Sequence, residues 1–110
     1  MDEINVYKME WNPMPVKGFA GKPLISHKNG GLKVVRIQPG AEFPLHQHPD
    51  KTEFAYVLEG TLETTIGDKI YTGKTGSFYQ FPVGVSHRLK NPAESETVVL
   101  VGSLKDEQEI

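Results

Sequence analysis

The sequence predicts an all-β domain built as a small β-barrel. Three observations predict this class. A length of 110 residues suits one domain. Eleven glycines and eight prolines favour many short strands joined by tight turns over long helices. Runs rich in β-branched residues also recur with turn signals roughly every 8–12 residues, a spacing typical of sandwiches and barrels.

The N-terminal third has the least regular pattern. Residues 4–9 and 24–27 are each expected to add an edge strand. The first clear strand covers residues 32–38, where the sequence Leu-Lys-Val-Val-Arg-Ile-Gln is rich in β-branched side chains. It ends at Pro39-Gly40, a turn pair that does not continue a strand.

The middle of the chain predicts a meander of consecutive strands. Residues 54–58 form an apolar run that closes at Glu59-Gly60, and residues 61–66 and 69–72 follow on either side of Gly67-Asp68. Three further strands are expected after the meander, over residues 77–81, 85–89 and 96–101.

These strands suggest a simple organisation into one domain. We expect an N-terminal arm over residues 1–30, a barrel over residues 31–104 and a frayed C-terminal tail over residues 105–110. The runs 54–58 and 98–101 are apolar at successive positions, so both faces of each strand need cover. A homodimer would cover the outer side; the alternative is cover by the chain's own N-terminal arm.

Composition excludes several classes of function. The net charge is −2 and the charges are mixed, so we expect no nucleic-acid partner. Without cysteine, a metal site must use nitrogen and oxygen ligands. The acidic N-terminus lacks the pattern of a secretory signal and no segment is apolar over a membrane-spanning length. We therefore expect a cytoplasmic protein without a membrane partner.

Three of the four histidines fall in a pattern that can bind metal. His46 and His48 are two residues apart, which places both imidazoles on the same face of a strand. Glu53 has an odd offset from His48, but the turn sequence at residues 49–51 lets the chain reverse and bring Glu53 back on the neighbouring strand, pointing at the same ion. Taken singly, a histidine pair, a glutamate or His87 is more typical of an ordinary surface or core position.

Together, these residues match both halves of a known two-part signature. The first half has fixed positions at Gly40, His46, His48, Glu53 and Gly60, and the second at Gly76, Pro82, Gly84, His87 and Asn91. All ten positions are filled at the spacing of the cupin superfamily, which this sequence resembles over residues 40–91. The resemblance implies a jelly roll, or double-stranded β-helix, of two antiparallel sheets.

The resemblance also implies roles for the ten residues. His46, His48, Glu53 and His87 would be the ligands of one divalent metal ion. The glycines and Pro82 would serve turns, and Asn91 would cap the turn into Pro92. Three imidazoles and a carboxylate suit Mn, Fe, Co, Ni, Cu or Zn, so the ligands alone do not identify the ion.

A pocket beside the metal would be shaped by side chains that flank the ligand strands. The candidates are Arg36, Phe43, Tyr56, Tyr79, Gln80 and Phe81. For each of them, core packing or exposure to solvent is the alternative.

Three functions are compatible with such a site. The first is a metal-dependent enzyme (dioxygenase, isomerase or decarboxylase type) that acts on a small oxygen-rich molecule. The second is a non-catalytic module that binds or senses a sugar or an acid and uses the metal to orient it. The third is a barrel whose metal is only structural. No residue identifies the substrate or a catalytic acid or base.

Overall fold

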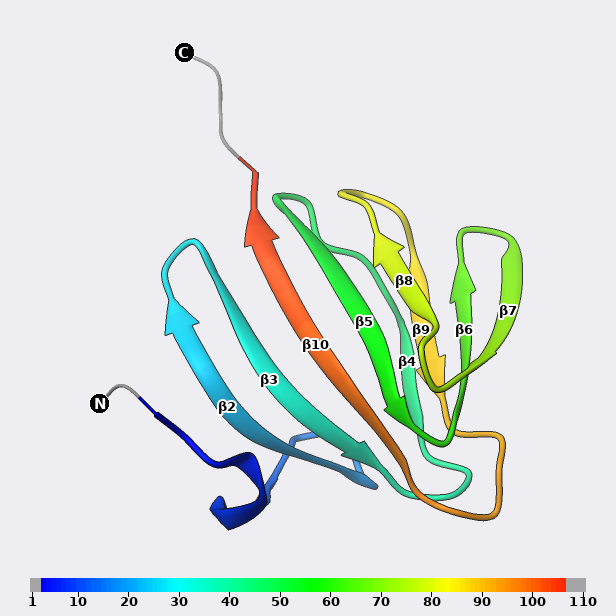
Figure 1. Ribbon diagram of the computed structural model, residues 1–110. Coiled ribbons are helices and arrows are strands. Elements are labelled where there is room, and N and C mark those ends of the chain that lie inside the picture. Colours follow the sequence, from blue (N-terminus) through cyan, green and yellow to red (C-terminus); the bar gives the residue numbers. More distant parts are fainter. Residues whose placement is uncertain (1–2, 107–110) are drawn as a thin grey trace.

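The computed structural model describes residues 3–106, which form two antiparallel sheets packed face to face (Figure 1). The larger sheet has the order β1-β2-β3-β10-β5-β8. Its strands are β1 (Asn12–Pro13), β2 (Phe19–His27), β3 (Gly30–Ile37), β10 (Thr97–Lys105), β5 (Lys51–Glu59) and β8 (Phe78–Phe81). The smaller sheet contains β4 (Glu42–His46), β9 (His87–Lys90), β6 (Thr61–Ile66) and β7 (Lys69–Lys74), in that order. The predicted all-β jelly roll is confirmed.

The N-terminal segment lacks the first of its two expected strands, and the second is longer than expected. The expected strand over residues 4–9 is wrong: a 3₁₀ turn, η1 (Val6–Lys8), begins there because the Asn5 side chain accepts a hydrogen bond from the Tyr7 amide. The strand expected over residues 24–27 is the end of β2, which pairs with β3 from Phe19 to His27. No helix among residues 3–106 has the length and apolar character needed to cross a membrane.

Most of the remaining strands lie where turn residues and β-branched runs predict them. β6 has the expected bounds, and β5 and β10 extend the expected runs at one or both ends. The tail was expected to fray from residue 105, but Lys105 is still part of β10 and pairs with Lys51 of β5. Residues 107–110 of that predicted tail lie outside the described part of the chain.

The core lies between the two sheets and is built by the alternation of side chains along the strands, which is interrupted where the strand register shifts. Val35 and Ile37 of β3 and Val99 of β10 face Leu62 and Leu89 of the smaller sheet, and all five are buried. Alternation sends the intervening residues to the outside of the larger sheet. A side chain of that sheet therefore points either into the barrel or onto one outer face.

The outer face of the larger sheet carries a groove beneath the N-terminal segment. We call this the outer groove; its volume is about 660 Å³, and it is lined by Val6, Tyr7, Trp11, Lys22, Leu24, Val34, Arg36, Leu58, Glu59, Glu96, Val98 and Leu100. The Trp11 ring contacts two cations, with Lys22 Nζ 4.3 Å and Arg36 Cζ 4.7 Å from its centroid. Lys22 Nζ also donates a hydrogen bond to the Val6 carbonyl, which ties the N-terminal segment to β2.

The turn at Gly60 moves the chain from the larger sheet to the smaller one. Gly60 has a φ of 86°, and a Cβ atom there would lie 2.7 Å from the Glu96 carbonyl oxygen. Only glycine fits this combination of left-handed backbone and close approach. Asn91 is fully buried, donates to the Ile37 and Ser95 carbonyls and accepts from the Ala93 amide, a structural role that agrees with the expected cap.

Candidate metal centre

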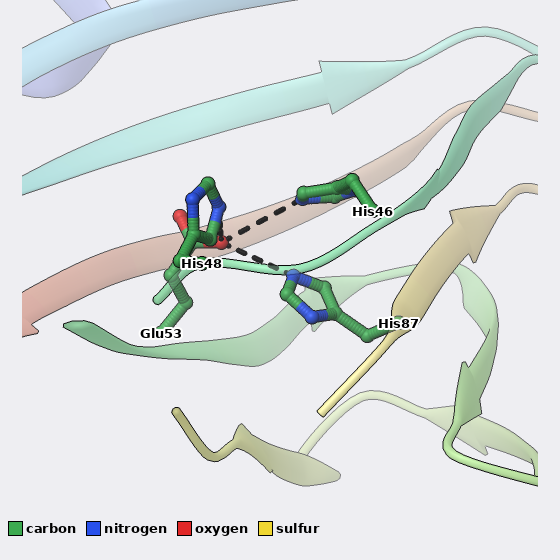
Figure 2. A group of neighbouring side chains, drawn as sticks. All are labelled: His46, His48, Glu53 and His87. Carbon is green, nitrogen blue, oxygen red and sulfur yellow. Dashed lines mark hydrogen bonds and ion pairs between the residues drawn. The ribbon is translucent and has the colours of Figure 1, made fainter. Parts of the chain in front are cut away.

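Four side chains converge at one end of the barrel, between the two sheets (Figure 2). They are His46, His48, Glu53 and His87, and one nitrogen or oxygen atom from each lies within 4.8 Å of the others. Glu53 Oε1 is 2.7 Å from His48 Nε2, 3.1 Å from His87 Nε2 and 3.8 Å from His46 Nε2. The structure therefore brings together all four residues singled out in the sequence, and they could hold a metal ion.

An irregularity in β4 aims His46 into the barrel. Phe43 pairs with Leu89 of β9 and also packs on the core. With regular alternation His46, three residues later, would point outward. A register shift between Phe43 and His46 inserts one residue, so that His46 pairs with His87 and faces inward. The imidazole rings of His46 and His87 then lie 4.2 Å apart.

His48 and Glu53 reach the cluster from the two ends of one connection. His48 lies just after β4, where its carbonyl accepts a hydrogen bond from the Gly84 amide. The bend at residues 49–50 then leads into β5, where Glu53 is the third residue. The reversal predicted at residues 49–51 is present, but β5 lies in the opposite sheet and is not the neighbour of β4. Glu53 therefore faces the histidines across the barrel.

His87 is the most deeply placed of the four ligands. Its side chain is 3% exposed, whereas those of His46 and His48 are 26% and 27% exposed. The buried Phe81 ring stacks on the imidazole, with 4.5 Å between centroids and 8° between planes. This contact restrains the orientation of the ring, so that Nε2 points at Glu53.

The hydrogen bonds of the imidazoles fit a cation at the centre of the cluster. His46 Nδ1 is 2.8 Å from the Pro44 carbonyl oxygen and His87 Nδ1 is 3.2 Å from the Val85 carbonyl oxygen. A carbonyl only accepts, so each Nδ1 carries the proton, and Nε2 of the neutral ring presents a lone pair. Those lone pairs face the Glu53 carboxylate, an arrangement that requires either a second proton on the ring or a shared cation.

Glu53 is held in its ionised form. Burial raises the pKa of its carboxyl group, but the hydrogen bond with His87 and the nearby charges of His48, Lys51 and His87 outweigh that effect. The net result is a pKa below the ordinary value. A carboxylate that stays ionised is a metal ligand over a wide pH range.

Cavities border the cluster on both sides. Towards the core lies a small inner chamber of about 70 Å³, lined by Met14, Phe19, Lys33, Val35, Phe43, His46, Glu53, Phe81, His87, Leu89 and Val101. Towards solvent lies a mouth cavity of about 240 Å³, lined by Pro23, Ile25, Ser26, Gly31, Leu32, Lys33, Lys51, Glu53, Val101, Gly102 and Ser103. An ion held by the four ligands would thus be accessible to a small molecule.

The structure brings only some of the six candidate pocket residues to the cluster. Phe43 and Phe81 line the inner chamber. Tyr79 packs against the core on the same face as Phe81, but its ring lies beside Tyr71, with 5.9 Å between centroids. Phe43 and Phe81 are therefore the candidates that shape the site.

Three of the six candidates lie on the outer face of the larger sheet, away from the cluster. Arg36 alternates with the buried Val35 and Ile37 and reaches Glu96 at 3.6 Å. Tyr56 lies between the buried Ala55 and Val57 and is 39% exposed. Gln80, between Tyr79 and Phe81 in β8, is exposed as well. The expectation that these three flank the metal is corrected, because flanking a ligand strand in sequence does not fix the facing of a side chain.

Sequence reasoning missed two lysines and a serine that line the mouth cavity. Lys33 is two residues before the buried Val35, and Lys51 is two residues before Glu53, so both share the inward face of their strands. Ser103 pairs with Glu53 across β10 and β5. Because side chains two apart on a strand share a face, the inward position of Val35 could have identified Lys33 as inward-facing from the sequence.

Comparisons with known proteins agree with the fold. A family described as "Cupin domain" matches residues 33–102. The germin-like protein subfamily 2 member 2 of Arabidopsis thaliana is 43% identical over 74 residues, which are 63% of this chain and 34% of the plant protein. The xanthan biosynthesis protein XanB of Xanthomonas campestris is 36% identical over 63 residues, 57% of this chain and 14% of XanB. The chain thus spans about a third of the length of the plant protein and about a seventh of XanB.

Among solved structures, a predicted oxalate decarboxylase from Thermotoga maritima is similar with a TM-score of 0.86. The match covers 94% of this chain and 99% of that chain at 18% sequence identity. At this identity, the likeness bears on the fold alone.

Proposed function

Because the chain belongs to the cupin superfamily, we propose that it is a metal-dependent enzyme that acts on a small oxygen-rich molecule. His46, His48, Glu53 and His87 would hold one divalent ion. The observation that carries the proposal is their convergence within 4.8 Å at a point bordered by cavities on both sides. A purely structural site is usually closed by its protein ligands and needs no such access.

The chain's own residues would bind and orient the reactants. An ion in this site would supply Lewis-acid or redox chemistry at a coordinated oxygen, which suits dioxygenation, isomerisation or decarboxylation. Phe43 and Phe81 line the inner side with apolar rings, and the stack on Phe81 would hold the ring of His87 in place. The donor set suits Mn, Fe, Co, Ni, Cu or Zn.

The first experiment determines the metal of the purified protein. Elemental analysis is made on the protein prepared without added metal, on His46→Ala and on His27→Ala. His27 is exposed and lies outside the cluster, so it is the matched control. We expect close to one equivalent of metal in the wild type and in His27→Ala, and loss of it in His46→Ala. Absence of metal that titration does not restore would contradict the proposal.

The second experiment tests for turnover. The metal-loaded protein is incubated with diketones, phenols, hydroxy acids and sugars, and products are followed by mass spectrometry and oxygen consumption. We expect a product that His46→Ala does not form. Saturable binding that returns every ligand unchanged would favour the alternative, a module that binds or senses a sugar or an acid.

We also propose that the chain forms a homodimer through the outer face of its larger sheet. Tyr56, Leu58 and Phe78 are 39%, 40% and 57% exposed there and give this face apolar surface that a second copy would cover. The outer groove holds Arg36 beside Glu59 and Glu96, so two copies related by a twofold axis could pair opposite charges.

The cytoplasmic location stays a prediction that cell fractionation would test.

A further inference from the structure

The entrance to the site carries an excess of lysine side chains. Lys33 and Lys51 line the mouth cavity on either side of β10. A wider cavity of about 460 Å³ continues toward solvent; this rim cavity is lined by His27, Lys28, Asn29, Gly30, Gly31, His48, Asp50, Lys51, Ser103 and Lys105. Lys51 and Lys105 are paired across β5 and β10, so two like charges lie side by side at the same face.

The two inward lysines make no direct contact with a carboxylate in the described chain, although the charge of Lys51 acts on Glu53 from a greater distance. Over residues 3–106, neither the Lys33 nor the Lys51 ammonium has a hydrogen bond or an ion pair within 4.0 Å of a carboxylate. Both side chains are partly buried. Over the described residues neither ammonium is a buried atom without a partner, so both reach solvent at the cavity wall, where they can pair with an anionic ligand.

Counting charges across the cavities gives the sign of the ligand. Asp50 is the only carboxylate besides Glu53 among the described lining residues, and Glu53 would be bound to the ion. A divalent ion with three neutral imidazoles and one carboxylate carries one net positive charge. With Lys33 and Lys51, the mouth cavity would hold three positive charges, a potential that attracts anions.

The position of the lysines fits a ligand bound at two points. Lys51 is two residues from Glu53 on the same strand face, a separation of roughly 6.5–7 Å along the backbone. Lys33 lines the inner chamber as well as the mouth cavity, so its side chain lies at the boundary between the two. Ser103 adds a hydroxyl group in the same wall, beside Glu53 in register.

We propose that Lys33 and Lys51 form an anion subsite that binds an acid group of the substrate while other oxygens of the same molecule reach the metal. The inference rests on the proposed metal site and narrows its substrate class to short organic acids or their phosphate analogues. The charge comes from a carboxylate or from a phosphate group, which share the chemistry of an oxyanion that accepts hydrogen bonds from lysine. The roughly 6.5–7 Å between Lys51 and Glu53 along the strand is a distance that a short acid can span.

The test measures binding to the cobalt-loaded protein. Malonate, its neutral isostere malonamide and inorganic phosphate are titrated by calorimetry, and visible absorption of Co²⁺ reports entry of each probe into the coordination sphere. The variants are Lys33→Gln, Lys51→Gln and Lys33→Arg, with Lys69→Gln as control. Lys69 is an exposed lysine of β7 in the other sheet. Cobalt content and thermal unfolding are measured for every variant.

We expect malonate to bind at least about tenfold more tightly than malonamide, and each Lys→Gln change to weaken malonate about tenfold. Lys33→Arg and Lys69→Gln should bind malonate like the wild type. Phosphate that binds more tightly than malonate with the same dependence on the lysines would also support the subsite and would assign it to a phosphate group.

Equal binding of malonate and malonamide, or no effect of either Lys→Gln change in protein that holds cobalt, would overturn the subsite and leave the metal site intact. Failure of the wild type to take up cobalt would instead overturn the proposed function, and this inference with it.

Discussion

Glu53 Oε1 lies 3.1 Å from His87 Nε2 although the two residues are 34 positions apart and belong to opposite sheets. β5 provides the carboxylate from the larger sheet, and β9 provides the imidazole from the smaller one. His46 joins His87 from β4 of the smaller sheet. The cluster thus links the two layers of the jelly roll at one end of the barrel.

A bound divalent ion should therefore stabilise the whole fold. At a free metal concentration of about 100 times Kd, linkage predicts about 2.7 kcal/mol of added stability, a rise in Tm of roughly 10 °C for a domain of this size. Thermal unfolding with and without a chelator measures the effect. His46→Ala should abolish the shift and His27→Ala should retain it; a shift that survives in His46→Ala would place the ion elsewhere.

The charge of Glu53 should stabilise the metal-free protein in a defined pH range. The pKa of Glu53 is lowered in the folded protein, so the stabilisation is present above the ordinary value of 4.5 and is lost as the pH falls through the folded-state pKa. Urea unfolding from about pH 6 to about pH 3 should show that wild type and Glu53→Gln differ most at the upper end. A constant difference across this range would mean that the charge of Glu53 is not the cause.

The stack of Phe81 on His87 should position the ligand as well as fill the core. Phe81→Leu keeps most of the apolar volume and should cost about 1 kcal/mol of stability. Because the His87 ring loses its planar support, metal affinity should fall by up to about tenfold. Ile70→Leu, at a 64% exposed position on β7 away from the cluster, is the control and should change neither property. Unchanged metal affinity in Phe81→Leu would restrict Phe81 to packing.

The proposed dimer should depend on the outer face of the larger sheet. Leu58→Glu adds a carboxylate beside Glu59 and Glu96 in the outer groove and should give a monomer in analytical ultracentrifugation. Ile70→Glu changes a side chain that is 64% exposed on β7 and should leave the dimer intact. Wild-type protein that sediments as a monomer at high concentration would rule out the interface.

The metal ligands could be predicted from the sequence because their spacing is fixed by the fold. His46, His48, Glu53 and His87 match a pattern of ten positions, and the glycines of that pattern all adopt positive φ angles in the structure. Strand positions were also predictable, because β-branched runs and turn residues mark both ends of most strands. Both predictions rest on features that are readable in the sequence itself, namely local turn and strand residues and a motif with every position filled.

The wall of the site was less predictable, because it depends on which face each side chain takes. The inserted residue before His46 and the crossing from β4 to β5 between sheets are tertiary features without a local signal. Arg36 was expected at the metal and lies outside, whereas Lys33, three residues earlier, lies inside. When the inward face of β3 is assigned one residue out of step, Arg36 is placed at the site instead of Lys33.

The position of Trp11 determines what intrinsic fluorescence can report. It is the only tryptophan in the chain, and it lies in the outer groove in contact with Lys22 and Arg36, on the side of the larger sheet opposite the metal cluster. Binding of an ion at the metal cluster should leave the surroundings of the indole unchanged. Release of the N-terminal segment, or burial of the outer groove by a second copy, should change the polarity around the indole directly. Tryptophan emission and metal-centred absorption are thus independent signals for the two faces of one sheet.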